Sequence, residues 1–423
     1  MLRSSSVPAL PSPGISLRAS ASPPRLLSIV LLALCVAGAA GCGRNQPLSP
    51  ELGSSATPMR TAGVAYVDPT PGVPLHLIGM LGPGAQYVID KPASWNGMLI
   101  VWAHGYIAPD DPIQVPNLGA LGQFFLSQGF ALAASSFSEN GYAVAEGSRQ
   151  THQLAMLFSD LVAEPDRRFL VGVSLGSIIS LKILETLSHT YDGALLVSTL
   201  GGGSDDEVRY LADVWVLFDK FFPDASLPPL FGERPGPFPQ AQLVGLITDP
   251  DNAQRFQLFL AFARERSLPF ASGPEAVQAT LTALGFAWIG ALDFLDRTHG
   301  HVLVDNSETV YTAPGVPQPI VDDVNATVDR FTSTLDAEAY LRKYYEPDGD
   351  PQIPVITLHD ERDPLVPIFH EDLYRILVQL HDPGLLRQYS VDAFGHVSPT
   401  LQGQIPSRFL ELVTWVNLLA ATP

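Results

Sequence analysis

Hydrophobic positions along the first half of the chain alternate between two patterns. Short, continuously apolar runs predict buried strands, and the stretches between them have the spacing of amphipathic helices. The expected strands cover residues 96–105, 131–137, 167–173 and 193–198, and the expected helices cover residues 117–130, 148–163 and 175–187. Strands that alternate with helices predict a mostly parallel sheet covered by helices on both faces.

The alternation stops near residue 201 and resumes near residue 350. Between these points the sequence is mostly helical and rich in aromatic residues, with the clearest helical spacing in residues 208–222, 252–265 and 277–297. We expect residues 201–349 to form a helical cap inserted into an α/β core of residues 61–200 and 350–423. For most of the aromatic residues here, helical spacing predicts the core of this cap, and the lining of an acyl or aromatic pocket is the alternative for a few. They are Trp215, Phe218, Phe221, Phe222, Phe259, Phe262, Phe286 and Trp288.

The second part of the α/β core supplies the remaining elements of the sheet. Residues 351–360 and 385–391 are expected strands, and residues 367–380 and 406–420 are expected helices. Strands from both sides of the insertion are needed to complete one sheet, which favours a single interrupted domain over two separate ones.

The N-terminal 42 residues have the features of an export signal. Arginines precede an uncharged apolar run at residues 26–40, which is short for a transmembrane span. Small residues directly before Cys42 resemble a bacterial lipobox, which implies acylation of Cys42; ordinary signal-peptidase cleavage nearby is the alternative. Residues 43–60 then read as a flexible tether. We expect a protein anchored by lipid in the cell envelope, with the outer membrane favoured, or secreted.

Composition and charge argue against several classes of function. The 423 residues carry a net charge of −19, which argues against nucleic-acid binding or membrane binding through a basic face. The two cysteines, Cys35 and Cys42, both fall in the predicted signal region. The mature chain therefore has neither an internal disulfide nor a cysteine nucleophile, and no cysteine can ligate a metal.

Residues 172–176, Gly-Val-Ser-Leu-Gly, place Ser174 between two glycines where an expected strand becomes a helix. A serine on such a sharp turn needs small neighbours on both sides, and the following helix N-terminus favours negative charge nearby. The context predicts that Ser174 is a nucleophile.

A serine nucleophile needs a base and an acid that orients the base. His396 lies in the loop between the last expected strand and the last helix, and is the candidate base. Asp363 follows an expected strand, and Asp360 is the alternative acid. Residues 363–367, Asp-Pro-Leu-Val-Pro, resemble the segment around the acid of α/β-hydrolases, and the chain order serine, aspartate, histidine is also that of this family.

The resemblance to α/β-hydrolases covers residues 96–201 and 351–420. It implies an oxyanion hole formed by the backbone N–H groups of Leu175 and Tyr106. It also implies that His104, in the Trp-Ala-His-Gly-Tyr segment, braces this loop and is not the catalytic base.

These features predict a serine hydrolase that cleaves carboxylic esters, with a small-molecule substrate bearing an apolar acyl or aromatic group. A peptidase or amidase with the same triad and a non-catalytic binding lipoprotein are the alternatives.

No cofactor is expected. No metal is expected either, because His299 and His301 lack a third ligand and residues 346–351 lack the EF-hand spacing. Other loop residues after core strands have either pocket or structural roles; they are Ser138, Asn140 and Tyr142.

Overall fold

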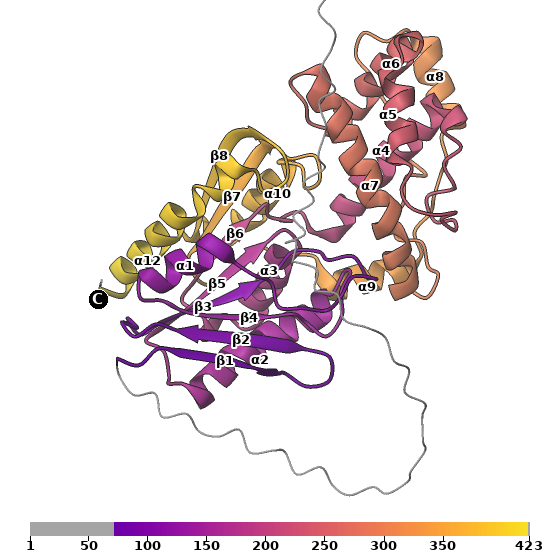
Figure 1. Ribbon diagram of the computed structural model, residues 1–423. Coiled ribbons are helices and arrows are strands. Elements are labelled where there is room, and N and C mark those ends of the chain that lie inside the picture. The colour runs from indigo at the N-terminus through magenta and orange to yellow at the C-terminus, as the bar shows by residue number, and fades with distance from the viewer. Residues whose placement is uncertain (1–71, 422–423) are drawn as a thin grey trace, which may run out of the picture. The chain divides into compact units, whose positions relative to one another are not determined.

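The computed structural model describes residues 72–421, which contain an eight-stranded sheet with helices packed around it (Figure 1). The strands lie in the order β1-β2-β4-β3-β5-β6-β7-β8. The predicted export signal, the tether and Cys42 lie outside the described residues, as do the first residues of the predicted core.

The sheet is parallel from β4 to β8 and antiparallel at its first edge, which confirms the predicted mostly parallel sheet. The strands are β1 (Leu75–Met80), β2 (Gln86–Lys91), β3 (Met98–Ala103), β4 (Ala131–Ser135), β5 (Arg167–Val173), β6 (Gly193–Val197), β7 (Val355–Arg362) and β8 (Leu386–Phe394). The hairpin of β1 and β2 was not expected. Strand β1 is only half-buried and forms the sheet edge, so its apolar signal is weak.

Alternate residues of the central strands pack into two separate hydrophobic layers. Ile100 and Trp102 of β3 contact one layer, whereas Leu99 and Val101 contact the other. Because both faces are covered, the central strands are apolar at nearly every position, and this explains the continuous runs in the sequence.

Helices from distant parts of the chain cover these two layers. The first layer includes α1 (Gly119–Ser127) and α12 (Ile405–Ala421), which meet through Phe125 and Phe409. The second includes α2 (Val144–Leu161) and α3 (Leu175–Thr186). The remaining elements of this core are α10 (Phe369–Val378), α11 (Pro399–Gln402) and the short 3-10 turns Ser188–Thr190 and Pro383–Leu385.

Six helices lie between β6 and β7 in the chain, and they form the helical insertion. They are α4 (Gly203–Phe221), α5 (Gln240–Thr248), α6 (Ala253–Glu265), α7 (Gly273–Arg297), α8 (Gln318–Thr327) and α9 (Leu335–Tyr345), with 3-10 turns at Pro223–Ala225 and Pro250–Asn252. Of the eight aromatic residues expected in the cap core, all but the half-buried Phe286 are buried. Among the described helices, α7 alone is long and apolar enough to cross a membrane. However, 61% of its most apolar window is buried inside the protein, as in the core helix of a folded domain.

Two neighbouring segments connect the insertion to the core. The backbone N–H of Asp205, at the start of α4, donates to a carboxylate oxygen of Glu346, at the end of the insertion, over 3.1 Å. The hydroxyl of Tyr142 contacts Ser204, at the start of α4, and accepts from the N–H of Tyr345 at 3.1 Å. The outgoing and returning segments are therefore tied to each other and to the loop after β4.

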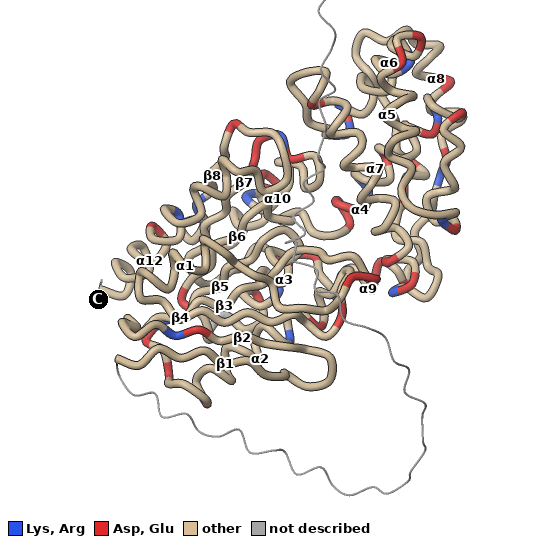
Figure 2. The backbone as a smooth tube through the Cα atoms, viewed as in Figure 1, with Lys and Arg blue, Asp and Glu red and all other residues tan. Residues whose placement is uncertain are grey.

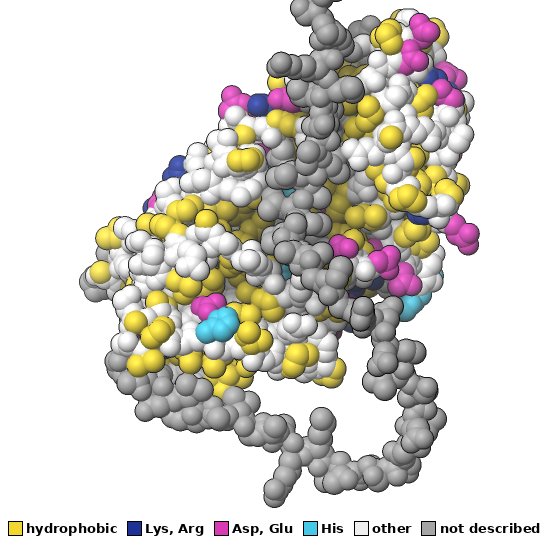
Figure 3. Space-filling model, viewed as in Figure 1, with side chains coloured by type: hydrophobic (Ala, Val, Ile, Leu, Met, Phe, Trp, Pro, Cys, Tyr) yellow, Lys and Arg dark blue, Asp and Glu magenta, His cyan; other side chains and the backbone are white. Residues whose placement is uncertain are grey.

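Acidic and basic residues are spread along the backbone of both the sheet core and the insertion (Figure 2). On the face shown in Figure 3, hydrophobic side chains lie between charged ones, and acidic side chains project from the rim of the insertion. This distribution agrees with the net charge of −19.

Candidate active site

Ser174 sits at a strained turn between β5 and α3, with φ 55° and ψ −124°. The two flanking glycines are required by packing. A Cβ on Gly172 would lie 2.2 Å from the carbonyl oxygen of Gly176, and a Cβ on Gly176 would lie 2.0 Å from the carbonyl oxygen of Ala103. Both distances are far shorter than a van der Waals contact, so the turn tolerates only glycine at these positions.

His396 and Asp363 contact each other directly. Nδ1 of His396 lies 2.7 Å from Oδ2 of Asp363, and the other carboxylate oxygen accepts the backbone N–H groups of Leu365 (2.9 Å) and Val366 (3.0 Å). Asp360, the alternative acid, instead binds the N–H and hydroxyl of Ser398, both within 2.7 Å. The geometry thus pairs His396 with Asp363 and gives Asp360 the task of holding the loop that carries His396.

The carboxylate of Asp363 is fully buried and ionised. Burial alone would raise its pKa, but the charge and hydrogen bond of His396, together with the charge of His359, lower the pKa below its ordinary value. A buried carboxylate in this state can orient an imidazole and stabilise its protonated form.

The loop after β3 lies against Ser174. A Cβ built on Gly105 would lie 3.3 Å from Cβ of Ser174 and 3.7 Å from its Oγ. The expected oxyanion residue Tyr106 follows immediately, and the second expected donor, Leu175, is the first residue of α3. His104 is buried behind this loop, stacked on Phe137 with ring centroids 3.9 Å apart, and its Nδ1 lies 2.7 Å from the carbonyl oxygen of Gly105. Burial lowers the pKa of His104, so the ring is neutral and suited to bracing.

Sheet topology brings the serine to the same edge as the acid and base. Ser174, Asp363 and His396 follow β5, β7 and β8, whose carboxyl ends meet at one edge of the sheet. Among the described residues, the structure contains the hydrogen bond between histidine and aspartate but none between Ser174 and His396. Such contacts are often longer before substrate binds.

A helix of the insertion also contacts the loop after β3. The hydroxyl of Tyr106 donates to Asp293 of α7 over 3.1 Å, and the same oxygen accepts the N–H of Tyr142 at 2.6 Å. Arg297 holds the other oxygen of Asp293 at 2.8 Å, and Phe286 packs edge-on against the Tyr106 ring. The role of Asp293 was not expected from sequence, because this residue is 187 positions from Tyr106 and forms no local motif with it. Phe286 was expected in the insertion, but its contact with Tyr106 was not.

A group of buried ionisable residues behind Asp363 was also not expected. His359 and Glu371 form one pair, and His370 and Glu207 form another. Asp363 and Asp360 of this segment were candidate acids from the sequence. No role could be assigned to His359, because no neighbouring residue in the sequence indicates the contact with Glu371. Two of the other loop residues singled out in the sequence have structural contacts. Asn140 donates to the carbonyl oxygen of Asp111 at 2.6 Å, and Tyr142 ties the insertion to the core.

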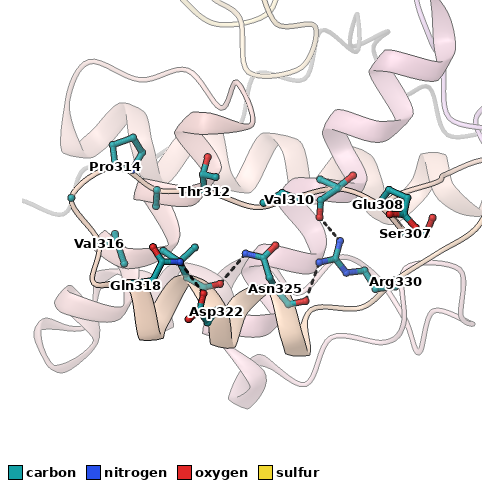
Figure 4. A pocket seen from close by; sticks show the side chains of 14 residues that line it. Ser307, Glu308, Val310, Thr312, Pro314, Val316, Gln318, Asp322, Asn325 and Arg330 are labelled. Carbon is teal, nitrogen blue, oxygen red and sulfur yellow. Dashed lines mark hydrogen bonds between the residues drawn. The ribbon is translucent and has the colours of Figure 1, made fainter.

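A cavity of about 690 Å³ lies within the insertion, between residues 307–316 and α8 (Figure 4). Both polar and apolar side chains line it, and Arg330 there donates to the carbonyl oxygens of Asn306 and Thr309. None of the residues expected in the active site lines this cavity. Within residues 72–421, no group of three or more histidine and acidic side chains is placed to hold a metal ion.

No protein-family model and no curated protein matches the sequence. Solved structures with a similar fold include an esterase from Aspergillus oryzae, with 13% sequence identity, a TM-score of 0.46, and coverage of 77% of this chain and 72% of that one. Feruloyl esterase B from the same organism shows 13% identity, a TM-score of 0.47 and coverage of 81% and 80%. The acylaminoacyl peptidase of Pyrococcus horikoshii shows 12% identity, a TM-score of 0.43 and coverage of 80% and 41%.

These similarities are too weak to transfer an activity. The strand order and the turn at Ser174 give this chain the α/β-hydrolase fold.

Proposed function

We propose that this protein is a serine hydrolase that cleaves carboxylic esters through an acyl-enzyme. The observation that carries the proposal is the 2.7 Å hydrogen bond between His396 and Asp363, at the sheet edge where Ser174 occupies its strained turn. An oriented imidazole and a serine held at the start of a helix are the two parts that acyl transfer requires.

The reaction proceeds in two halves. Oγ of Ser174 attacks the ester carbonyl carbon as Nε2 of His396 takes its proton, and the carbonyl electron pair moves to oxygen. The N–H groups of Leu175 and Tyr106 stabilise this oxyanion. Collapse breaks the bond to the alkoxy oxygen, which leaves as the alcohol with the proton from His396. Water then attacks the acyl-enzyme by the same route, which releases the carboxylic acid and restores Ser174.

The test compares the wild type with Ser174→Ala on a short-chain aryl ester. The change should lower kcat at least about 10⁴-fold, as expected for loss of a triad nucleophile. Ser407→Ala, an exposed serine in α12, serves as the matched control and should retain activity. Undiminished hydrolysis by Ser174→Ala would remove the assignment.

Two other functions remain as alternatives, and the same proteins separate them. A peptidase or amidase would use the same triad, so a panel of esters of increasing chain length, aryl esters and amino-acyl amides determines the preferred bond. A non-catalytic binding protein would not react with a fluorophosphonate. Labelling of the folded wild type that disappears in Ser174→Ala supports the enzyme, whereas an unlabelled folded protein supports the binder.

We also propose that the chain is exported and anchored by an acyl group on Cys42. The support is the apolar run of residues 26–40 followed by small residues directly before the cysteine. Metabolic labelling with a clickable fatty acid should mark the wild type and should not mark Cys42→Ser. An unlabelled wild type in the culture medium would indicate simple secretion.

A further inference from the structure

His359 and Glu371 lie directly behind the candidate catalytic acid. His359 is on β7, four residues before Asp363, and is fully buried, while Glu371 on α10 is 7% exposed. Nδ1 of His359 lies 3.0 Å from Oε1 of Glu371, and its Nε2 lies 3.8 Å from Oδ2 of Asp363. The imidazole therefore stands between two buried carboxyl groups.

The hydrogen bonds around Glu371 show that its side chain is an acceptor. The amide nitrogen of Gln388 donates to the backbone carbonyl of Glu371 at 2.7 Å and to Oε2 at 2.6 Å. The hydroxyl of Thr357 also donates to Oε2. With two donors on one oxygen and the imidazole on the other, the arrangement matches an ionised carboxylate.

The hydrogen bonds of His359 then require protons on both ring nitrogens. Nε2 lies 2.7 Å from the carbonyl oxygen of Val366, which can only accept, so Nε2 carries a hydrogen. Nδ1 faces the carboxylate of Glu371 and must donate as well. Burial alone would lower the pKa of His359, but the hydrogen bond and charge of Glu371 and the charge of Asp363 outweigh it and raise the pKa to about 9.

The neighbouring histidine, His370, does not add a second positive charge. Nδ1 of His370 accepts the N–H of Gly202 at 3.1 Å, so its Nε2 carries the hydrogen that faces Glu207. Burial and the charge of His359 lower the pKa of His370 to about 3. Burial and the charge of Asp363 raise the pKa of Glu207 well above its ordinary value, and burial also raises that of Asp360. His359 is thus the one buried cation among the described groups that face Asp363 from behind.

We propose that Glu371 holds His359 as a permanent imidazolium, and that this buried positive charge keeps Asp363 ionised and sets the low-pH limit of the reaction; the second part rests on the proposed hydrolase function. His359 and Glu371 are positioning residues, because they act on Ser174 only through Asp363 and His396. The positive end of the pair faces Asp363, so it opposes the addition of a further proton to the hydrogen-bonded pair of Asp363 and His396.

One substitution can neutralise the pair without disturbing its packing. In Glu371→Gln, the amide oxygen can take the place of Oε2 and accept from Thr357 and Gln388. The amide nitrogen takes the place of Oε1 and donates to Nδ1 of His359, which becomes neutral while Nε2 still donates to Val366. Glu361→Gln is the matched control, because Glu361 is on the same strand as His359 but is exposed and lies outside this buried group.

The kinetic measurement is the acid limb of kcat/KM against pH on an aryl ester. Loss of the positive charge should make it easier to add a further proton to the pair of Asp363 and His396, so the limb in Glu371→Gln should move to higher pH by about half a unit to one unit. Activity on the plateau should change less than about threefold, since the triad itself is intact. The limb of Glu361→Gln should coincide with that of the wild type. A limb unmoved in Glu371→Gln would overturn the catalytic part of the proposal.

A second measurement does not depend on turnover. In the full chain labelled with ¹³C at histidine Cε1, the resonance of His359 should keep the chemical shift of an imidazolium from pH 5.5 to 8. The resonance of His359 is identified as the one that is lost in His359→Gln. If that variant does not fold, it is identified as the one that moves to the chemical shift of a neutral imidazole in Glu371→Gln. A neutral His359 at pH 7 in the wild type would overturn the whole inference. A charged His359 in a protein without Ser174-dependent hydrolysis would instead overturn the proposed function alone.

Discussion

Gly176 shows how closely the turn at Ser174 is packed. A Cβ there would meet the backbone carbonyl of Ala103 at 2.0 Å, and backbone atoms of a central strand cannot move aside cheaply. We expect Gly176→Ala to lower the free energy of unfolding by about 1–3 kcal/mol or more and to reduce activity. Gly245→Ala, exposed in α5 with nothing within 4 Å, should gain up to about 1 kcal/mol from helix propensity. Thermal unfolding of both variants makes the comparison, and equal stabilities would contradict the packing argument.

The two aspartates near His396 should respond differently to the same change. Asp363→Asn removes the charge that orients the base, so kcat should fall by roughly 10³–10⁴-fold with little change in folding. Asp360→Asn disturbs the loop at Ser398, so it should mainly lower the melting temperature and reduce kcat far less. Kinetics and thermal unfolding of the two variants decide the assignment, and the reverse order of kinetic losses would make Asp360 the acid.

Residues with a local geometric requirement were the ones that the sequence could predict. Ser174 needs glycines two positions away on each side, and all three residues lie within the five-residue segment 172–176. Glu207, by contrast, meets His370 across 163 positions. Neither residue carries a local signal of that contact, so the buried ionisable groups behind Asp363 could be found only in three dimensions.

At the scale of elements, α7 is the part of the insertion that contacts the loop after β3, which carries the proposed oxyanion donor Tyr106. Asp293 holds both the side chain of Tyr106 and the backbone of Tyr142, so its loss should let the loop at Gly105 move. We expect Asp293→Ala to lower kcat about tenfold with a smaller change in KM, because an oxyanion donor acts mainly in the transition state. Asp296→Ala, exposed on the same helix, is the control. A pure KM effect would mean that Asp293 acts in substrate binding only.

Elements were predictable where burial leaves a strong pattern. Strands β3, β5 and β6 are apolar at almost every position because both faces are covered, and each was expected near its observed place. Helices α8 and α9 were not expected. Few of their residues are buried, so their helical spacing is hard to distinguish from that of polar loops.

For the whole molecule, several half-buried or buried groups bind protons more tightly when the chain is folded. Burial raises the pKa of Glu185 from its ordinary value of 4.5 to about 7. Burial and the charges of Asp205 and Asp206 raise the pKa of Glu346 from 4.5 to about 7 as well. Despite burial, contacts with Glu371 and Asp363 raise the pKa of His359 from 6.5 to about 9. Between these values the folded protein holds more protons than the unfolded chain, so stability must fall as pH rises.

We therefore expect these three groups to make the melting temperature fall toward pH 9, whereas the lowered pKa values of His104 and His370 act in the opposite direction below about pH 6.5. The two carboxyl groups act between about pH 4.5 and 7, and His359 acts between about pH 6.5 and 9. In Glu346→Gln the decline between pH 5 and 7 should be smaller, while the decline from pH 7.5 to 9 should match that of the wild type. The exposed Glu265→Gln controls for the change in net charge. A Glu346→Gln protein with the full decline below pH 7 would show that Glu346 titrates alike in the folded and unfolded chain. The segment that closes the insertion would then not be the source of this pH dependence.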